Sequence, residues 1–188
     1  MAVKRRIFIP QLCFACGSIT FLPACSRDFS KWRFLTDREA SILIAISEQF
    51  IPADKDPGAT DANVINFFDK QLKGYYTRYQ EIYRKGLQYI ESAAMKIFGK
   101  SFIDMEWEQQ TRLLESMEAG KLPAEDWKDI DQKFFFRLLL DHTMQGFYGS
   151  PRHGGNCHYV SYKMMRIDYP HIIGQNRYTE DNIQPYRN

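Results

Sequence analysis

Phe134-Phe135-Phe136-Arg137-Leu138-Leu139-Leu140 is an apolar run interrupted by a single charge. Four of its side chains recur at the spacing of one helical face, namely Phe134, Phe135, Leu138 and Leu139. An apolar face of this width is typical of a helix that its neighbours cover on most sides. We therefore predict that this run lies in the central helix of a helical bundle.

The acidic residues ahead of this run are predicted to begin the same helix. Pro123 is followed by Glu125 and Asp126, and Asp129 comes one turn later. Carboxylates in a first turn offset the partial positive charge of a helix N-terminus. We therefore interpret these three acidic residues as a solvated first turn, in preference to a catalytic carboxylate cluster.

Four further helices are predicted nearer the N-terminus, over residues 36–51, 61–73, 75–98 and 104–117. The first has the clearest start, because Thr36 and Glu39 have the spacing of a capping box. No segment alternates for long enough to predict a strand. The expected fold is all-α: a single bundle-like domain of about five helices, with an irregular C-terminal segment rich in glycine and aromatic residues.

The helix predicted over residues 75–98 is unusually rich in tyrosine. Tyr75, Tyr79 and Tyr83 keep helical spacing within it. Two interpretations are open. We favour a core stripe whose hydroxyl groups reach the surface, and the alternative is a dedicated binding face.

The composition of the 188 residues restricts the function. Charged side chains make up 26% of the chain but leave a formal net charge of only +2, so nucleic-acid binding is not expected. Aromatic residues make up 15%, and this surplus over the needs of one small core indicates contact with a protein partner.

Residues 1–24 resemble an export signal. Lys4, Arg5 and Arg6 precede an apolar stretch over residues 7–22 that is too short and too interrupted for a comfortable transmembrane helix. The arginine pair is similar to a twin-arginine signal, which exports folded proteins. We therefore expect an exported protein of the bacterial periplasm or cell envelope.

Cys25 is the candidate lipidation site. It follows Leu22-Pro23-Ala24, which resembles a bacterial lipobox. The alternative is an ordinary signal that is cleaved nearby, with Cys25 an incidental thiol. On this interpretation the chain divides into a signal (1–24), a tether (25–35) and a helical domain (36–188).

A segment rich in glycine and aromatic residues follows the central helix. Its members include Gly146, Phe147, Tyr148, Gly149, His153, Gly154 and Gly155. Glycine lets a backbone approach another surface closely, and aromatic rings supply contact area. We predict that this segment docks against another protein.

Two blocks of the sequence resemble the gluconate 2-dehydrogenase subunit 3 family. The first runs from Leu35-Thr36 and Glu39 through Phe50-Ile51-Pro52-Ala53 to Pro57-Gly58-Ala59. The second is Gly146-Phe147-Tyr148 followed by Pro151, His153, Gly154, Gly155 and Asn156. The residues that depart from the family pattern are Gln145, Ser150, His153 and Tyr162, and they bear on which partner the chain recognises.

The resemblance implies a non-catalytic small subunit with no cofactor of its own. In this family the FAD and the catalytic histidine belong to a large dehydrogenase of the glucose-methanol-choline type, often accompanied by a cytochrome c subunit. The small subunit is implied to stabilise the large one and to carry it across the membrane, with membrane contact through a lipid anchor or through the complex. The residues implied to contact the partner are Phe147, Tyr148, Pro151, Arg152, His153, Gly154, Gly155, Asn156 and Tyr162.

Other functions find less support in the sequence. A metal site could be drawn from His142, His153, Cys157 and His158, but their spacing is not that of a zinc finger or an HExxH helix. Ser150 lacks the GxSxG setting of a hydrolase nucleophile. The alternative function is an independent envelope lipoprotein that binds a small molecule or a metal, and an enzyme in its own right is a third.

Overall fold

The computed structural model describes residues 31–167, 172–173 and 176–177. The predicted export signal and Cys25 lie outside these residues. Within them the regular secondary structure is helical apart from two strands of two residues each, which confirms the predicted all-α class. No helix in this described part combines the length and the apolarity that a bilayer span requires.

The five predicted helices are present, with adjusted bounds, and a short sixth follows them. The α-helices are α1 (Asp37–Phe50), α2 (Val64–Lys73), α3 (Gln80–Phe98), α4 (Trp107–Glu118), α5 (Gln132–Tyr148) and α6 (Val160–Met164). The 3-10 turns are η1 (Thr77–Tyr79), η2 (Phe102–Asp104), η3 (Pro151–His153) and η4 (Cys157–Tyr159). The strands β1 (Ile172–Ile173) and β2 (Asn176–Arg177) pair antiparallel.

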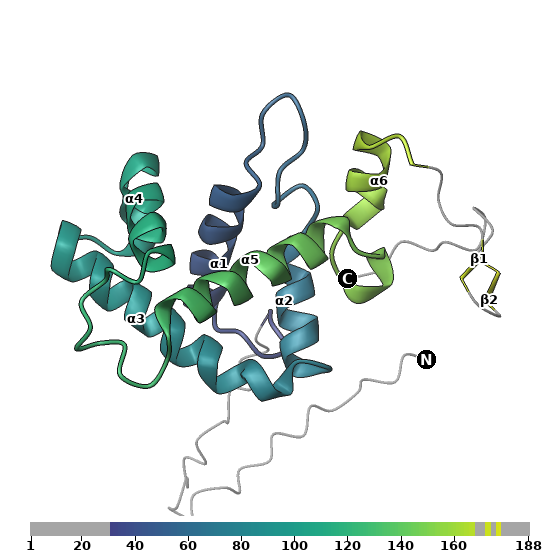
Figure 1. The fold of residues 1–188 in the computed structure, drawn as a ribbon. Helices are drawn as coiled ribbons and strands as arrows, with labels where there is room; N and C mark the ends of the chain where they lie inside the picture. The colour runs from purple at the N-terminus through teal and green to yellow at the C-terminus, as the bar shows by residue number, and fades with distance from the viewer. Residues whose placement is uncertain (1–30, 168–171, 174–175, 178–188) are drawn as a thin grey trace, which may run out of the picture.

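α5 runs across the other long helices, with α6 rising near its C-terminal end (Figure 1). It packs against α1, α2 and α4. Phe135 and Leu139 have no exposed area, and the Phe135 ring lies directly on the backbone of Gly86 in α3, where a Cβ atom would come within 2.4 Å of the ring. These contacts confirm α5 as the central helix.

α5 begins nine residues later than predicted. Asp131 is its N-cap, with a side chain that accepts a hydrogen bond from the Phe134 amide at 2.7 Å. The acidic residues upstream are therefore not a helical first turn. They lie in an irregular segment, where Asp126 binds Lys96 at 2.6 Å and Asp129 binds Lys85 at 3.3 Å, both lysines belonging to α3.

The start of α1 agrees with the sequence prediction. The Thr36 hydroxyl accepts from the Glu39 amide at 3.2 Å, and the Glu39 carboxylate accepts from the Thr36 amide at 2.8 Å. This reciprocal pair satisfies two amides that a helix N-terminus otherwise leaves without partners. The predicted capping box is confirmed.

The last residues of the predicted tether are part of the folded domain. Asp69 of α2 is fully buried, and its carboxylate accepts from the backbone amides of Arg33, Phe34 and Leu35 at 2.9, 2.8 and 3.1 Å. The Arg33 guanidinium adds an ion pair at 3.2 Å. These donors replace the water contacts that the carboxylate loses on burial. Residues 33–35 are therefore fixed to α2.

An aromatic stack lies between α5 and the start of α3. The ring of His142 in α5 lies nearly parallel to the rings of Tyr76 and Tyr83, with ring centroids 4.3 and 5.8 Å away. Its Nδ1 atom is 2.8 Å from the Tyr83 hydroxyl. The stack supports the core interpretation for Tyr83, which is completely buried, but not for Tyr75, which is 74% exposed.

We expect Asp69→Asn to lower the free energy of unfolding by about 2–3 kcal/mol, since a buried amide cannot serve the same donors and presents N–H groups of its own. Urea unfolding of the purified chain measures this. The matched control is Asp129→Asn, which removes only a surface ion pair with a 59% exposed carboxylate and should cost under about 0.5 kcal/mol. Equal losses in both variants would contradict the anchoring role of Asp69.

We expect the chain to lose stability in acid partly through His142. Burial, and secondarily the Arg78 charge, lowers the pKa of His142 from 6.5 to about 4. As the pH falls, a base whose pKa is lowered by folding takes up its proton first in the unfolded chain. The contribution of His142 to the free energy of unfolding is therefore complete above pH 6.5 and is lost as the pH falls toward 4. The loss reaches up to about 3 kcal/mol.

Urea unfolding at a series of pH values checks this. His142→Phe keeps a ring in the stack but cannot take a proton, so its unfolding free energy should change less steeply than that of the original chain between pH 6.5 and 4. Parallel pH profiles for the two proteins would show that the lowered pKa of His142 contributes nothing.

Candidate docking site

The segment predicted to dock a partner packs largely against its own chain. Gly154, Gly155 and Asn156 are buried. Gly155 lies on the backbone of Gly146 in α5, so closely that a Cβ atom would come 2.0 Å from the Gly146 carbonyl oxygen. Gly154 has a φ of +111°, which favours glycine, and it lies on the Asn66 backbone of α2.

Hydrogen bonds from α2 hold η3 and the glycines after it. Asn66 donates to the Gly154 carbonyl at 2.7 Å, Gln71 to the His153 carbonyl at 2.9 Å, and Lys70 to the Arg152 carbonyl at 2.6 Å. The backbone of η3 is therefore fixed to one face of α2. A surface built on it is preorganised, which reduces the entropy lost when a partner binds.

Asn156 closes the turn that leads into α6. Its side-chain amide donates to the Gly149 carbonyl at 2.9 Å, and its Oδ1 atom accepts from the Ser161 amide at 2.9 Å. Its φ is +46°, a conformation that asparagine tolerates better than most residues. Asn156 is thus a structural residue of this turn.

The nine predicted contact residues divide by exposure. The buried ones are Phe147, Gly154, Gly155 and Asn156, and the half-buried ones are Pro151 and Tyr162. Tyr148, Arg152 and His153 are exposed. Direct contact with a partner is open to the exposed and half-buried residues, whereas the four buried residues shape the segment.

The glycines make their close approach within the chain. Gly154 and Gly155 allow close approach, but the surface that they approach is α2 and α5 of the same chain. Any side chain at position 155 would have to displace the backbone of α5 or of the segment itself, because a Cβ there would come 2.0 Å from the Gly146 carbonyl oxygen.

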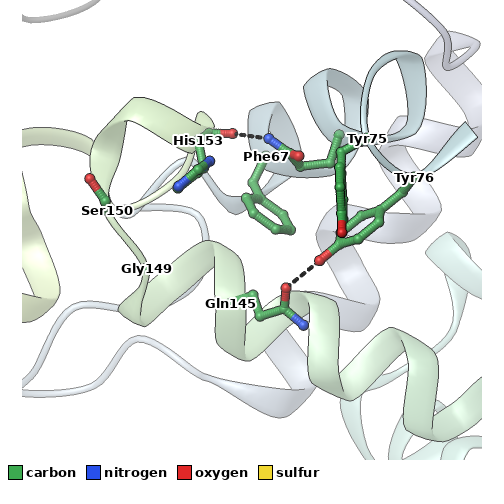
Figure 2. A pocket seen from close by; sticks show the side chains of 8 residues that line it. Phe67, Tyr75, Tyr76, Gln145, Gly149, Ser150 and His153 are labelled. Carbon is green, nitrogen blue, oxygen red and sulfur yellow. Dashed lines mark hydrogen bonds between the residues drawn. The ribbon is translucent and has the colours of Figure 1, made fainter. Parts of the chain in front are cut away.

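Beside η3 lies an open pocket of about 510 Å³, which we call the aromatic pocket (Figure 2). Its lining residues are Phe67, Gln71, Tyr75, Tyr76, Gln145, Gly149, Ser150 and His153. They come from α2, the turn after α2, the end of α5 and η3. In Figure 2 the Phe67 ring occupies the middle, with Tyr76 on one side and Gly149 on the other.

The polar groups of the aromatic pocket largely satisfy one another. The Tyr76 hydroxyl donates to Gln145 Oε1 at 2.6 Å, and Gln71 donates to the His153 carbonyl. Phe67 makes edge-to-face contact with Tyr76 at 6.4 Å. The pocket therefore offers mainly ring surface to a ligand or partner.

Basic side chains surround the aromatic pocket. The Arg78 guanidinium lies over the three neighbouring tyrosines, closest to Tyr79 at 4.6 Å. Arg152 Nε is 3.1 Å from His153 Nε2. Burial, and then the charges of Arg152 and Lys70, lower the pKa of His153. Both burial and these two positive charges favour the neutral form of His153.

Three residues of the aromatic pocket were not predicted from the sequence, namely Phe67, Gln71 and Tyr76. The available signal was the tyrosine density after Gly74, which we interpreted mainly as core. Tyr75 and Tyr76 contribute to the aromatic pocket, while Tyr83 lies in the core below it. The two interpretations of the tyrosine-rich stretch therefore apply to different residues.

The structure separates two of the residues considered as metal ligands. His142 is buried in the aromatic stack, and His153 lies at the surface beside Arg152. In the described part of the chain, no group of three or more histidine, cysteine, aspartate or glutamate side chains is arranged to hold a metal ion.

Comparison with known proteins identifies the family. A family model described as gluconate 2-dehydrogenase subunit 3 matches residues 37–168, a span that includes α1 through α6. No curated protein and no solved structure matches the chain. Since the match covers well over half of the 188 residues, the chain belongs to the gluconate 2-dehydrogenase subunit 3 family.

Proposed function

We propose that this chain is a non-catalytic small subunit that stabilises a large FAD-dependent dehydrogenase and escorts it during export. The match over residues 37–168 carries the proposal, because the family is described as a subunit of a dehydrogenase. We assign the large subunit to the glucose-methanol-choline type, with a sugar, a sugar acid or an alcohol as substrate and a cytochrome c subunit as a further component.

The surface beside the C-terminal segment supports a role in protein contact. Met144 and Tyr148 of α5 are 41% and 37% exposed, and Tyr75 at the aromatic pocket is 74% exposed. Large exposed apolar side chains on a fixed backbone are typical of protein interfaces. Under this proposal the FAD and the reacting groups belong to the large subunit.

Export and membrane attachment complete the proposal. We assign the arginine pair Arg5-Arg6 to a twin-arginine export signal, which would carry a folded large subunit together with this chain. We assign Cys25 as the lipidated residue. The assembled complex would then act at the bacterial cell envelope.

Co-expression tests the subunit role. The full-length chain, tagged at its C-terminus, should co-purify in a fixed ratio with a flavoprotein encoded by an adjacent reading frame. Without the chain, the soluble yield of that flavoprotein should fall several-fold, because an unassembled subunit is removed by proteases. Flavin absorbance and gel densitometry measure both effects.

A chain that elutes alone, with no flavoprotein and with a bound metal ion or small molecule, would support the alternative of an independent lipoprotein. Turnover of a sugar or alcohol by the purified chain without flavoprotein would instead establish an enzyme.

Lipidation is tested by fatty-acid labelling in cells. The full-length chain should incorporate an alkyne-bearing fatty acid and sediment with membranes, and Cys25→Ala should lose the label. The matched control is Cys157→Ala, which removes a half-buried thiol of the folded domain and should keep the label. Equal labelling of both variants would remove Cys25 as the attachment site.

A further inference from the structure

We propose that the aromatic pocket receives an acidic segment of the large subunit, one that inserts an apolar side chain between Tyr75, Phe67 and His153 and sets carboxylates against the surrounding basic residues. The inference rests on the proposed function and adds to it the place of contact and the chemistry of the segment that binds there.

The shape of the aromatic pocket favours a side chain as its occupant. Its volume of about 510 Å³ is within the usual range for a binding pocket, about 300–1,000 Å³. The hydroxyl of Tyr76 and the amide of Gln71 are engaged within the chain. What remains for an occupant is chiefly the ring surface of Phe67 and the tyrosines, which suits an apolar anchor.

Tyr75 is the most exposed large apolar side chain of the described chain, at 74%. Its ring contacts the Tyr76 ring at 5.3 Å, and Arg78 lies over it at 5.8 Å. A tyrosine that keeps few rotamers loses little entropy on binding and gives a large contact area. Tyr75 is therefore the residue that a partner would cover most.

Charge complementarity specifies the rest of the occupant. None of the eight residues that line the aromatic pocket is acidic. The elements around the pocket carry basic residues, namely Lys70, Lys73, Arg78 and Arg152. They also carry the acidic residue Asp141, which is one turn before Gln145 on α5. A segment with carboxylates beside its apolar anchor matches this distribution.

The binding test uses the purified full-length chain and the purified flavoprotein from the adjacent reading frame. Calorimetry gives the Kd for the original chain and for two variants, Tyr75→Ala and Arg78→Gln. The matched controls are Trp107→Ala, which removes a 47% exposed ring, and Arg112→Gln, which removes an exposed charge. Both controls lie on α4, at the opposite end of the molecule from η3 and α6 (Figure 1).

We expect Tyr75→Ala to weaken binding by about tenfold or more, as removal of a central aromatic contact does. Arg78→Gln should weaken it by about threefold to tenfold and should reduce the loss of affinity between low and high salt, because one screened attraction is gone. The controls should stay within about twofold. Circular dichroism and urea midpoints verify that all four variants are folded.

The outcomes separate this inference from the proposed function. If the original chain binds the flavoprotein and both pocket variants bind equally well, the pocket assignment is overturned while the subunit role stands. If the original chain does not bind the flavoprotein at all, both fall.

A photo-crosslinker at position 75 identifies the occupant directly. In the complex it should join a peptide of the flavoprotein that has aspartate or glutamate next to an apolar residue. A crosslinked peptide rich in lysine or arginine, or a small molecule found in the pocket of the purified complex, would overturn the assignment.

Discussion

The backbone contact between Gly155 and Gly146 determines where the surface of this protein lies. The two main chains can approach this closely because Gly155 has no side chain, and the carbonyl of Gly146 occupies the place where a Cβ of Gly155 would be. The contact draws the chain after α5 back along that helix and α2. It thereby places Ser150 and His153 beside Phe67 and forms one wall of the aromatic pocket.

The same principle operates along the whole of α5. At its N-terminal half the Phe135 ring lies on Gly86 of α3, and at its C-terminal half Gly146 lies on Val64 and Phe67 of α2. Between them, His142 is held by stacking and by the Tyr83 hydroxyl. A central helix that is covered this closely cannot shift without disturbing the core, so the pocket on its C-terminal end is rigidly supported.

Local signals in the sequence predicted the fold well. The capping box at Thr36 and the helical periodicities depend on residues three or four apart, and the structure agrees with them. The start of α5 was predicted wrongly, since Asp126 and Asp129 bind lysines of α3 that lie 30 and 44 residues away in the sequence. The anchoring role of Asp69 was not predicted either, because its hydrogen-bond partners are 34 to 36 residues away in the sequence.

The candidate site shows a different limit. The sequence marked the glycine-rich segment as a place of close approach, but the freedom of glycine is the same whether the approached surface belongs to a partner or to the chain itself. Only the packing of α2 against α5 distinguishes the two cases. The pocket depends on that packing too, so Phe67 and Tyr76 could not be assigned to it from local pattern.

Under our proposal that Cys25 carries a lipid, the attachment of residues 33–35 to Asp69 limits the distance between the domain and the bilayer. Cys25 is eight residues before Arg33. A fully extended chain of that length spans at most about 28 Å. The tether would then hold the α2 side of the domain close to the bilayer. A large subunit would have to bind beside the domain, because the space between the domain and the bilayer would be too small for it.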